Sequence, residues 1–469
     1  MLTERLARFV IETRSADIPD PVLAGACDAL LDTFGVALAG TVEPAGEIVE
    51  RWIHELGARP QATFWGHRQA TSPADAAFAN GVCAHALDFD DSLPSLRGHP
   101  SATMIPAALA AAEVAGATGA AVLAAYALGL EVAGKLGQAM GHGHYLRGWH
   151  TTATIGVFSS TAVVSRLWGL DPPGLCRAWG LAASQVSGLI RNFGTMTKPF
   201  HAGHAARCAL QAVWLTRAGF TADDRIFDGE DSVLATHHGA DGAPLAGLLE
   251  TLGRPWEMTE PGIYVKRWPC CYCNHRPVGG LLELVKKHGI SADEVRQVEI
   301  GFLPGTDNAL VSHDPQTALE GKFSIEYAAA ATLLDGDLTL ETFTDAMVRR
   351  PQVRELMGKV RRCRIPDDKT YSGVVGYTDV AIETARGRFE MRVDRTPGSP
   401  AWPMTAQDRA EKFLSCAGRV LGAPGAHRLL DLIRNCRTLP DVRELLRATV
   451  PLDTREAAKP GVQPAPTPH

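Results

Sequence analysis

The hydrophobic positions in the first 260 residues recur at the spacing of buried helices. In one segment they fall at Leu23, Ala26 and Leu30, which is typical of one face of an α-helix. Ser72 and Pro73 then provide a helix cap and a first-turn proline. Further helices are predicted at about 100–116, 120–134, 151–167, 173–188 and 201–217. No convincing strand pattern precedes residue 260, so this part of the chain is predicted to be all-helical.

The pattern changes after residue 262. Hydrophobic and polar residues alternate at 298–302 and 379–384, and a turn joins the latter segment to a third one at 389–393, as in β-strands. Helical patterns lie between them. This mixture predicts a smaller α+β domain at 263–400. Helical periodicity then returns up to about residue 450, and pattern alone does not show where those helices pack.

Length and composition describe a globular protein with two domains. A chain of 469 residues exceeds what one hydrophobic core usually supports. Its 45% of hydrophobic and 21% of charged residues are an ordinary globular balance. The formal charge of −6 comes without a basic stripe, so nucleic acid is not expected as a partner. The last residues, 456–469, contain four prolines and are predicted to be a disordered tail.

The chain shows no targeting or membrane signal that changes this picture. The N-terminus carries Glu4 and has no continuous hydrophobic segment with a cleavage site, so a cytoplasmic location is expected. In segment 116–134 the sole charge is Glu131, but the abundance of Ala and Gly fits a helix buried in protein better than one in lipid. The ten cysteines are expected to be reduced.

A polar turn between two hydrophobic helices is the first candidate site. Asp88 and Asp91 stand three residues apart in the segment 85–92, so both could project from one side of a last helical turn. Carboxylates this close alter one another's pKa and can act as acid or base. Acidic residues at a helix C-terminus interact unfavourably with the helix dipole, which argues against a purely structural role for this turn. His99 alone would be a capping or packing residue, but a nearby carboxylate fixes its tautomer and raises its basicity.

Two later clusters combine histidines with a lysine. His142 and His144 lie two residues apart in a glycine-rich loop, and without a third ligand they match a metal site poorly. His150 stands at the head of a hydrophobic helix, where a helix N-terminus favours a substrate carboxylate. Lys198 precedes a helix rich in alanine, so its ammonium group has reason to meet a carboxylate. The alternative is a solvent-facing lysine with histidines that only pack.

The segment 266–275 combines Lys266, Arg267, a C-x-x-C pair and His275. A zinc site would need a second ligand pair, and a redox pair would need a βαβ frame. Neither the second ligand pair nor the βαβ frame is present. Two cationic residues before a histidine at a helix start instead favour recognition of an anion. Tyr327, which precedes a run of alanines, is either a core residue or a hydroxyl donor.

Four motifs in this order resemble the MmgE/PrpD family, which includes 2-methylcitrate dehydratase, cis-aconitate decarboxylase and iminodisuccinate epimerase. The motifs are His-x-x-Asp-Phe-Asp-Asp at 85–91 with His-Pro-Ser at 99–101, Lys-Pro-x-His-x-Gly-x-Ala-Ala at 198–206, Lys-Arg-x-Pro and His within 266–275, and Phe-Ser-x-x-Tyr at 323–327. Each motif is weak alone, but four in register are specific.

The resemblance implies a fold class, an assembly and a set of site residues. The fold is expected to be mainly α, with a large all-helical domain formed by residues 1–262 and 401–455 and an inserted α+β lid at 263–400. A homodimer without metal or organic cofactor is also implied. The residues that match the family's pocket are Asp88, Ser92, His99, His150, Lys198, His275 and Tyr327.

The sequence departs from the family pattern at two points. Ser92 stands where the motif more usually has Thr, which keeps the hydroxyl group. The loop 93–98, Leu-Pro-Ser-Leu-Arg-Gly, lacks the Trp that both the methylcitrate and the aconitate branches have after the hydroxyl residue. Within this loop, Arg97 is a candidate for binding an extra substrate carboxylate.

The expected function is that of a cofactor-independent lyase, a dehydratase or decarboxylase, acting on a small di- or tricarboxylic acid. His99 with Asp88 would move a proton beside the reacting carbon, and positioned cations would stabilise the carbanion-like charge. The catalytic candidates are Asp88, His99, His150, Lys198 and Tyr327; the substrate-binding candidates are Ser92, Arg97, His275, Lys266 and Arg267; no metal ligand is expected. An epimerase of a dicarboxylate such as iminodisuccinate, a noncatalytic carboxylate-binding homologue and a metal-dependent hydratase stay open as alternatives.

Overall fold

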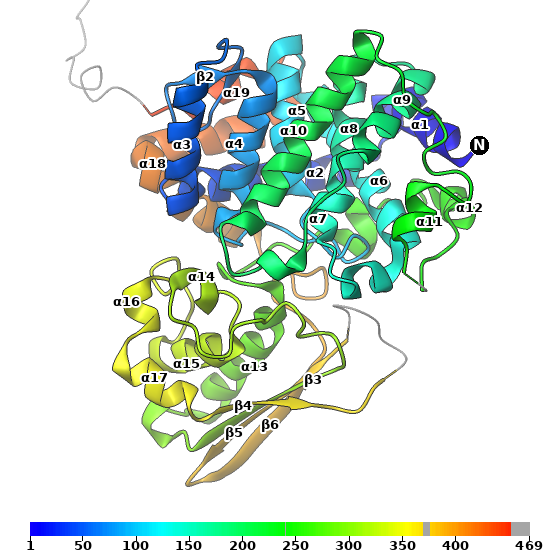
Figure 1. The fold of residues 1–469 in the computed structure, drawn as a ribbon. Helices are drawn as coiled ribbons and strands as arrows, with labels where there is room; N and C mark the ends of the chain where they lie inside the picture. Colours follow the sequence, from blue (N-terminus) through cyan, green and yellow to red (C-terminus); the bar gives the residue numbers. More distant parts are fainter. Residues whose placement is uncertain (240, 369–375, 452–469) are drawn as a thin grey trace, which may run out of the picture.

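The computed structural model describes residues 1–239, 241–368 and 376–451. The two largest hydrophobic clusters of these residues, called here the first and the second core, lie in different parts of the chain. Figure 1 shows the larger, helical part above and a smaller part with a β-sheet below. The predicted tail at 456–469 lies outside the described residues, as do residues 452–455 of the predicted helical domain. The predicted domain bounds stay a prediction.

The larger part is a bundle of helices wrapped around α2 and α6. Its N-terminal helices are α1 (Leu2–Glu12), α2 (Asp20–Gly40), α3 (Pro44–Leu56), α4 (Pro73–Ala86), α5 (Ser101–Ala115), α6 (Gly119–Leu146), α7 (Thr151–Thr154), α8 (Gly156–Leu167), α9 (Pro172–Ala183), α10 (Thr197–Arg217), α11 (Val233–His237) and α12 (Leu245–Leu248). The C-terminal helices α18 (Ala406–Arg434) and α19 (Arg443–Arg447) join them, with α18 packed along α2.

Helices α2 and α6 are long and apolar enough to cross a membrane by length and composition alone. In their most apolar windows, 78% and 89% of the residues are buried inside the protein. Hydrophobic residues surround both helices on nearly all sides, as in the central helix of a large bundle. We therefore describe them as core helices.

Glycine contacts bring α4 and α10 unusually close together. A Cβ atom added at Gly81 of α4 would lie 2.8 Å from the Gly203 Cα atom, and one added at Gly203 would lie 2.4 Å from the Phe78 carbonyl oxygen. Only residues without a side chain permit this separation. The contact places the end of α4, where the acidic turn begins, beside the start of α10, where Lys198 lies.

The smaller part holds a four-stranded mixed sheet with helices on one face. Its strands are β3 (Gln297–Phe302), β4 (Val360–Arg364), β5 (Thr378–Thr384) and β6 (Gly387–Val393), in the order β4-β3-β5-β6. β4 runs parallel to β3, and the other pairs are antiparallel. The helices of this part are α13 (Tyr272–His288), α14 (Ala318–Gly321), α15 (Ile325–Asp335), α16 (Asp345–Val348) and α17 (Pro351–Met357). α13 packs on β5 and β6, and α15 packs on α13.

The predicted fold class, a mainly α protein with an all-helical domain and an inserted α+β lid, is wrong as stated. Strands β1 (Ala62–Thr63) and β2 (Ala70–Thr71) form a small antiparallel sheet within the segment predicted to be all-helical. Each strand is two residues long, too short to produce a visible alternation. The smaller part is built on a mixed sheet of four strands, and no feature of the described residues identifies it as a lid.

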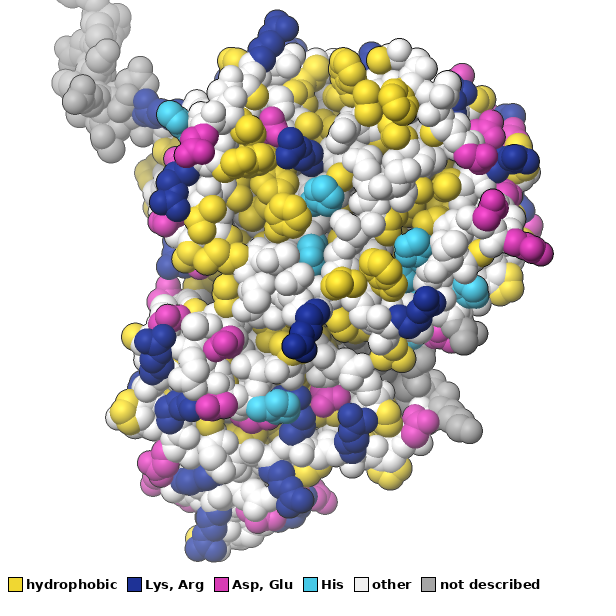
Figure 2. All heavy atoms as spheres, viewed as in Figure 1, with side chains coloured by type: hydrophobic (Ala, Val, Ile, Leu, Met, Phe, Trp, Pro, Cys, Tyr) yellow, Lys and Arg dark blue, Asp and Glu magenta, His cyan; other side chains and the backbone are white. Residues whose placement is uncertain are grey.

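The two parts differ in their surface chemistry. On the face drawn in Figure 2, hydrophobic side chains gather over the helical part, while charged side chains dominate the sheet-bearing part. Phe200 and Trp214 of α10 are 44% and 59% exposed. In the sheet-bearing part the charges pair with one another, as Arg392 does with Asp379.

Candidate active site

A pocket lies between the two hydrophobic cores and receives residues from both parts. It encloses about 740 Å³ of space, including its open mouth. The helical part contributes residues of the acidic turn, the loop 92–99 and the starts of α7 and α10, and the smaller part contributes residues 264–273 and 305–309 together with Phe323. Hydrophobic and aromatic residues form most of its wall, and a few polar groups converge at one end. This arrangement is typical of a small-molecule site.

Asp88 is the centre of the polar end. Helix α4 ends just before it, and Asp88 itself has a left-handed backbone with φ of 51°. Its Oδ1 atom accepts hydrogen bonds from Lys198 Nζ at 2.6 Å and Lys266 Nζ at 2.9 Å. Burial alone would raise the pKa of Asp88, but the two ammonium groups outweigh it and hold the pKa well below its usual range. Asp88 is therefore ionised, and two cations surround one anion.

Lys266 keeps its charge although it is fully buried. Burial lowers the pKa of Lys266, but the carboxylates of Asp88 and Asp90 outweigh that effect and raise it. The Lys198, Lys266 and Asp88 side chains together carry one surplus positive charge, which the nearby Asp90 carboxylate offsets in part. A substrate carboxylate near this cluster would balance the surplus charge.

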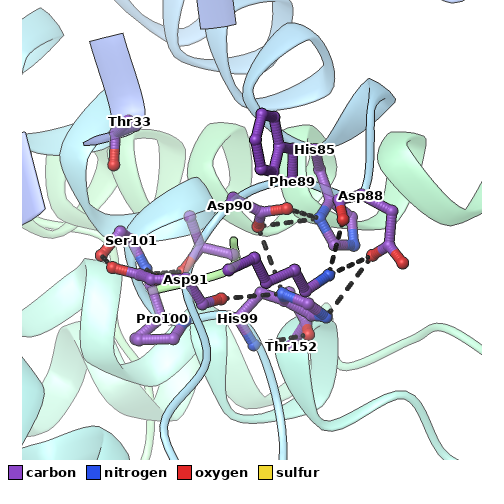
Figure 3. Close-up of polar contacts among 12 residues, drawn as sticks. Thr33, His85, Asp88, Phe89, Asp90, Asp91, His99, Pro100, Ser101 and Thr152 are labelled. Carbon is purple, nitrogen blue, oxygen red and sulfur yellow. Dashed lines mark hydrogen bonds and ion pairs between the residues drawn. The ribbon is translucent and has the colours of Figure 1, made fainter. Parts of the chain in front are cut away.

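His99 lies beside Asp88 with its two ring nitrogens in different surroundings (Figure 3). Nδ1 lies 2.8 Å from the Asp91 carbonyl oxygen and 3.3 Å from Asp90 Oδ2. Both groups are acceptors, so Nδ1 carries the proton and donates it. Nε2, which lies 3.8 Å from Asp88 Oδ1, is then left with its lone pair. Burial lowers the pKa of His99, although Asp90 opposes this effect, so the ring is a neutral base at the edge of the pocket.

The Asp90 carboxylate contacts the imidazole rings of His85 and His99. Both of its carboxylate oxygens lie 2.9 Å from His85 Nδ1, and Oδ2 also faces His99. The His85 and His99 rings lie 4.5 Å apart between centroids. Asp90 and His85 are buried and His99 is partly buried, and the two histidines outweigh burial and hold the pKa of Asp90 well below its usual range. Asp90 is thus the ionised carboxylate that orients His99, a role that the sequence had assigned to a nearby carboxylate without indicating which one.

Asp91 points away from this cluster, as Figure 3 shows. Its side chain accepts a hydrogen bond from the Ser101 hydroxyl group, which also contacts the Tyr126 hydroxyl oxygen at 2.6 Å. Burial, with the nearby charge of Asp32, raises the pKa of Asp91 to about 8. The three aspartates of the turn therefore do different things, and the expected pairing of Asp88 with Asp91 on one side does not occur.

Three lysines hold the carbonyl groups at the end of α4. Lys322, Lys266 and Lys412 donate from Nζ to the oxygens of Leu87, Asp88 and Phe89 respectively, each at 2.8 Å. All three lysines are buried. The carbonyl end of a helix attracts cations, so these lysines compensate for an acidic sequence placed at a helix C-terminus.

The structure brings six of the predicted site residues to the pocket. These are Asp88, Ser92, Arg97, His99, His150 and Lys198. His150 Nδ1 lies 3.0 Å from His201 Nδ1. Burial is the main cause that holds the pKa of His150 well below its usual range, and the nearby positive charge of Lys198 lowers it further. Lys266 lies behind Asp88 and acts on the pocket through that carboxylate.

Three predicted site residues do not line the pocket. The Tyr327 hydroxyl group donates to the Thr342 carbonyl oxygen at 2.5 Å within the second core. His275 is buried against the rings of Trp268 and Tyr272. Arg267 lies over the Trp268 ring, 5.7 Å from its centroid, and lines a separate surface groove.

Other pocket residues were not singled out as site residues by their sequence patterns. They include Tyr145, Phe193, Tyr264, Cys271, Tyr272, Cys273 and Phe323, with His142 as a third imidazole beside His99 and His150. His142 and His144 do not act together, because His144 is held by the His237 carbonyl oxygen and Thr154. The cysteines that reach the pocket are Cys271 and Cys273 rather than the C-x-x-C pair of Cys270 and Cys273.

One group of side chains has the spacing of a metal site. His85, Asp88, Asp90 and His99 could each offer a ligand atom, all within 4.8 Å of one another. However, Asp88 Oδ1 already accepts from two ammonium groups, and the Nδ1 atoms of both histidines face Asp90. A divalent cation here would meet two lysine charges. The two lysine charges therefore weigh against a metal ion at this group of side chains.

The sequence matches two models of one known family. The MmgE/PrpD N-terminal domain matches residues 4–245, and the MmgE/PrpD C-terminal domain matches residues 268–438. The chain is 27% identical over 453 residues to cis-aconitate decarboxylase of Homo sapiens, covering 94% of this chain and 92% of that protein. It is 26% identical over 461 residues to the Mus musculus enzyme of that name, covering 95% and 93%. To the cis-aconitate decarboxylase of Aspergillus terreus it is 25% identical over 470 residues, covering 95% of each chain.

Proposed function

The chain belongs to the MmgE/PrpD family, and from this membership we propose that it is a lyase that acts on a carboxylic acid of the aconitate type. Three relatives that match nearly its whole length are named cis-aconitate decarboxylase. We therefore propose decarboxylation of cis-aconitate as the reaction, with dehydration of a methylcitrate-type acid as the related outcome. A cytoplasmic homodimer that uses neither metal nor organic cofactor completes the proposal.

The observation that carries the proposal is the pairing of a cationic cluster with a neutral imidazole. Lys198 and Lys266 surround Asp88, and His99 Nε2 lies beside the same carboxylate. The cations would attract a substrate carboxylate and stabilise negative charge on the adjacent carbon. In dehydration, His99 would take the proton from that carbon, while the carbon–oxygen bond on the neighbouring carbon breaks and the hydroxyl group, protonated from solvent, leaves as water. In decarboxylation, the carbon–carbon bond to the leaving carboxylate breaks, carbon dioxide leaves, and the resulting carbanion receives a proton that His99 Nε2 has first taken up from solvent.

A turnover assay tests the proposed reaction directly. Purified protein is incubated with cis-aconitate, 2-methylcitrate, citrate and related diacids, and the mixtures are followed by NMR. We expect one carbon dioxide released for each cis-aconitate consumed. Loss of water from 2-methylcitrate would place the chain in the dehydratase branch. Deuterium uptake at a stereocentre in heavy water, without loss of water or carbon dioxide, would replace the lyase by an epimerase.

Substitutions then test whether the described residues perform the reaction. His99→Gln and Lys198→Ala are each expected to lower kcat/KM by at least about 100-fold, which is the ordinary contribution of a positioned proton-transfer group. His427→Gln, at an exposed histidine of α18, is the matched control and should keep the activity. Circular dichroism verifies that all three variants are folded. Wild-type kcat/KM in both site variants would reject this site.

A further inference from the structure

The loop 93–98, which departs from the family pattern, places one arginine in the pocket. Among the residues that the structure describes, Asp88 and Arg97 are the two non-glycine residues with a left-handed backbone, with φ of 51° and 55°. Both line the same pocket. A left-handed conformation is disfavoured for residues with a Cβ atom, and it concentrates at functional sites. The rare backbone conformation of Arg97 therefore marks it as a candidate functional residue of the pocket.

Hydrogen bonds fix the turn that carries Arg97. The Leu93 amide donates to the Gly98 carbonyl oxygen at 3.0 Å, and the Arg97 amide donates to the Leu93 carbonyl oxygen at 2.9 Å. The Thr151 hydroxyl group donates to the Arg97 carbonyl oxygen at 2.6 Å. The backbone of Arg97 is therefore held on both sides, which presents the side chain from a rigid support.

A buried ion pair anchors the same loop to α6. The Ser95 hydroxyl group donates to Glu257 Oε2 at 2.5 Å, and Glu257 Oε1 accepts from Lys135 Nζ at 3.0 Å. A Cβ atom at Gly137 would lie 2.3 Å from the Ser95 carbonyl oxygen. The loop and α6 are thus in close contact, and the loop has little room to move away from the pocket.

The guanidinium group of Arg97 lacks a carboxylate partner. It donates one long hydrogen bond, at 3.4 Å, to the Gly137 carbonyl oxygen, and no salt bridge joins it to an acidic residue within the described chain. The nearby carboxylate of Asp241 instead accepts from the His142 and Gly143 amides at 2.8 and 2.7 Å. Partial burial lowers the pKa of Arg97, and the negative charge of Asp241 partly offsets this effect. Partly buried arginines usually bind an anion with their fork of donors.

We propose that Arg97 forms a second carboxylate subsite, which binds a substrate carboxylate remote from the reacting carbon. This inference rests on the proposed function for the first subsite, at Lys198 and His99. Two separated cationic groups in one pocket select a polycarboxylate, because a monocarboxylate can occupy only one of them. The hydrophobic wall of the pocket, which includes Leu93 and Phe193, would contact the carbon chain of the substrate.

Binding of unreactive acids tests the subsite independently of turnover. Isothermal titration calorimetry compares propane-1,2,3-tricarboxylate, which cannot undergo the reaction for lack of a double bond or hydroxyl group, with butyrate. Arg97→Met should weaken binding of the tricarboxylate by 10-fold or more and change binding of butyrate by less than 3-fold. Arg97→Lys should lie between Arg97→Met and the wild type. With cis-aconitate, Arg97→Met should raise KM with little change in kcat.

Two results would overturn the subsite. One is equal weakening of both acids by Arg97→Met, which would indicate a general disturbance of the pocket; the other is unchanged tricarboxylate binding. Arg147→Met, at an exposed arginine near the end of α6, is the matched control and should bind like the wild type. If the wild type binds the tricarboxylate but converts no acid, the proposed reaction is wrong. The comparison of tricarboxylate binding between Arg97→Met and the wild type then still tests the subsite.

Discussion

Asp90 and Asp91 orient the ring of His99. Its Nδ1 atom faces the Asp90 carboxylate and the Asp91 carbonyl oxygen, whereas Asp88 is engaged by two lysines. Neighbouring residues of one short turn thus have separate tasks. Asp88 is a fixed charge that organises cations, and Asp90 sets the tautomer of the base.

Replacing Asp90 by Asn tests this division. The amide keeps the shape but can offer an N–H group to Nδ1, which would favour the wrong tautomer, so we expect kcat/KM to fall by about 10-fold or more. Asp90 raises the pKa of His99, so its loss lowers that pKa. The limb of the kcat/KM profile that reports His99 should therefore move to lower pH: this is the acidic limb if the ring acts as a base, as in dehydration, and the basic limb if it delivers a proton, as in decarboxylation.

A pH–rate profile of both proteins provides the measurement, and NMR of the imidazole nitrogens reports the tautomer. Asp75→Asn, at a buried acid in the first turn of α4 and outside the pocket, is the control and should keep the wild-type profile. A lower rate with an unmoved His99 limb and an unchanged tautomer would show that Asp90 only supports the fold.

Residue types at the site could be predicted from the sequence more reliably than side-chain directions. Lys198 and His99 reach the pocket because each stands at a helix start beside the acidic turn. Tyr327 and His275 belong to equally clear motifs, yet packing in the second core turns them elsewhere. Motif spacing along a chain carries no information on which side of a helix faces another part of the molecule.

Among the elements, long periodic segments were predicted and short or irregular ones were not. The strands β3, β5 and β6 confirm the alternating segments, and the long helices confirm the helical periods. β4 was missed because its sequence, Val-Arg-Arg-Cys-Arg, is an edge strand with little alternation in burial. β1 and β2 depend on contacts with α4 and α5 rather than on their own pattern.

The end of α4 depends on lysines from other elements. Lys322 donates to the carbonyl oxygens of Leu87 and Pro269, both at 2.8 Å, and burial lowers its pKa to about 8. Lys322→Met would keep the hydrophobic stem but leave two buried carbonyl groups unpaired. We expect the free energy of unfolding to fall by about 2–6 kcal/mol, since each of the two unpaired groups costs about 1–3 kcal/mol.

Urea denaturation followed by circular dichroism measures this loss. Lys287→Met replaces an exposed lysine of α13 and should change the free energy of unfolding by less than about 0.5 kcal/mol. If Lys322→Met were as stable as this control, the carbonyl groups would have found other donors, and the lysine contact at the helix end would not be a stabilising one.

At the scale of the whole molecule, the pocket is also the junction between the two parts. Ser92 and Tyr264 exchange backbone hydrogen bonds of 2.9 and 2.8 Å across it, and Lys266 reaches from the same segment to Asp88. A ligand that contacts both walls should therefore stabilise both parts together. A ligand held by one wall alone would stabilise only that wall.

Hydrogen exchange with and without propane-1,2,3-tricarboxylate distinguishes these cases. At a ligand concentration of about 100 Kd, binding stabilises the native state by about 2.7 kcal/mol, so amides that exchange through opening of the junction should slow markedly. We expect slower exchange in peptides covering 92–99 and in peptides covering 264–273, because both segments line the pocket. Peptides from β6, whose residues lie outside the pocket, serve as the internal control. Protection confined to 92–99 would mean that the sheet-bearing part does not take part in binding, and the pocket would then belong to the helical part alone.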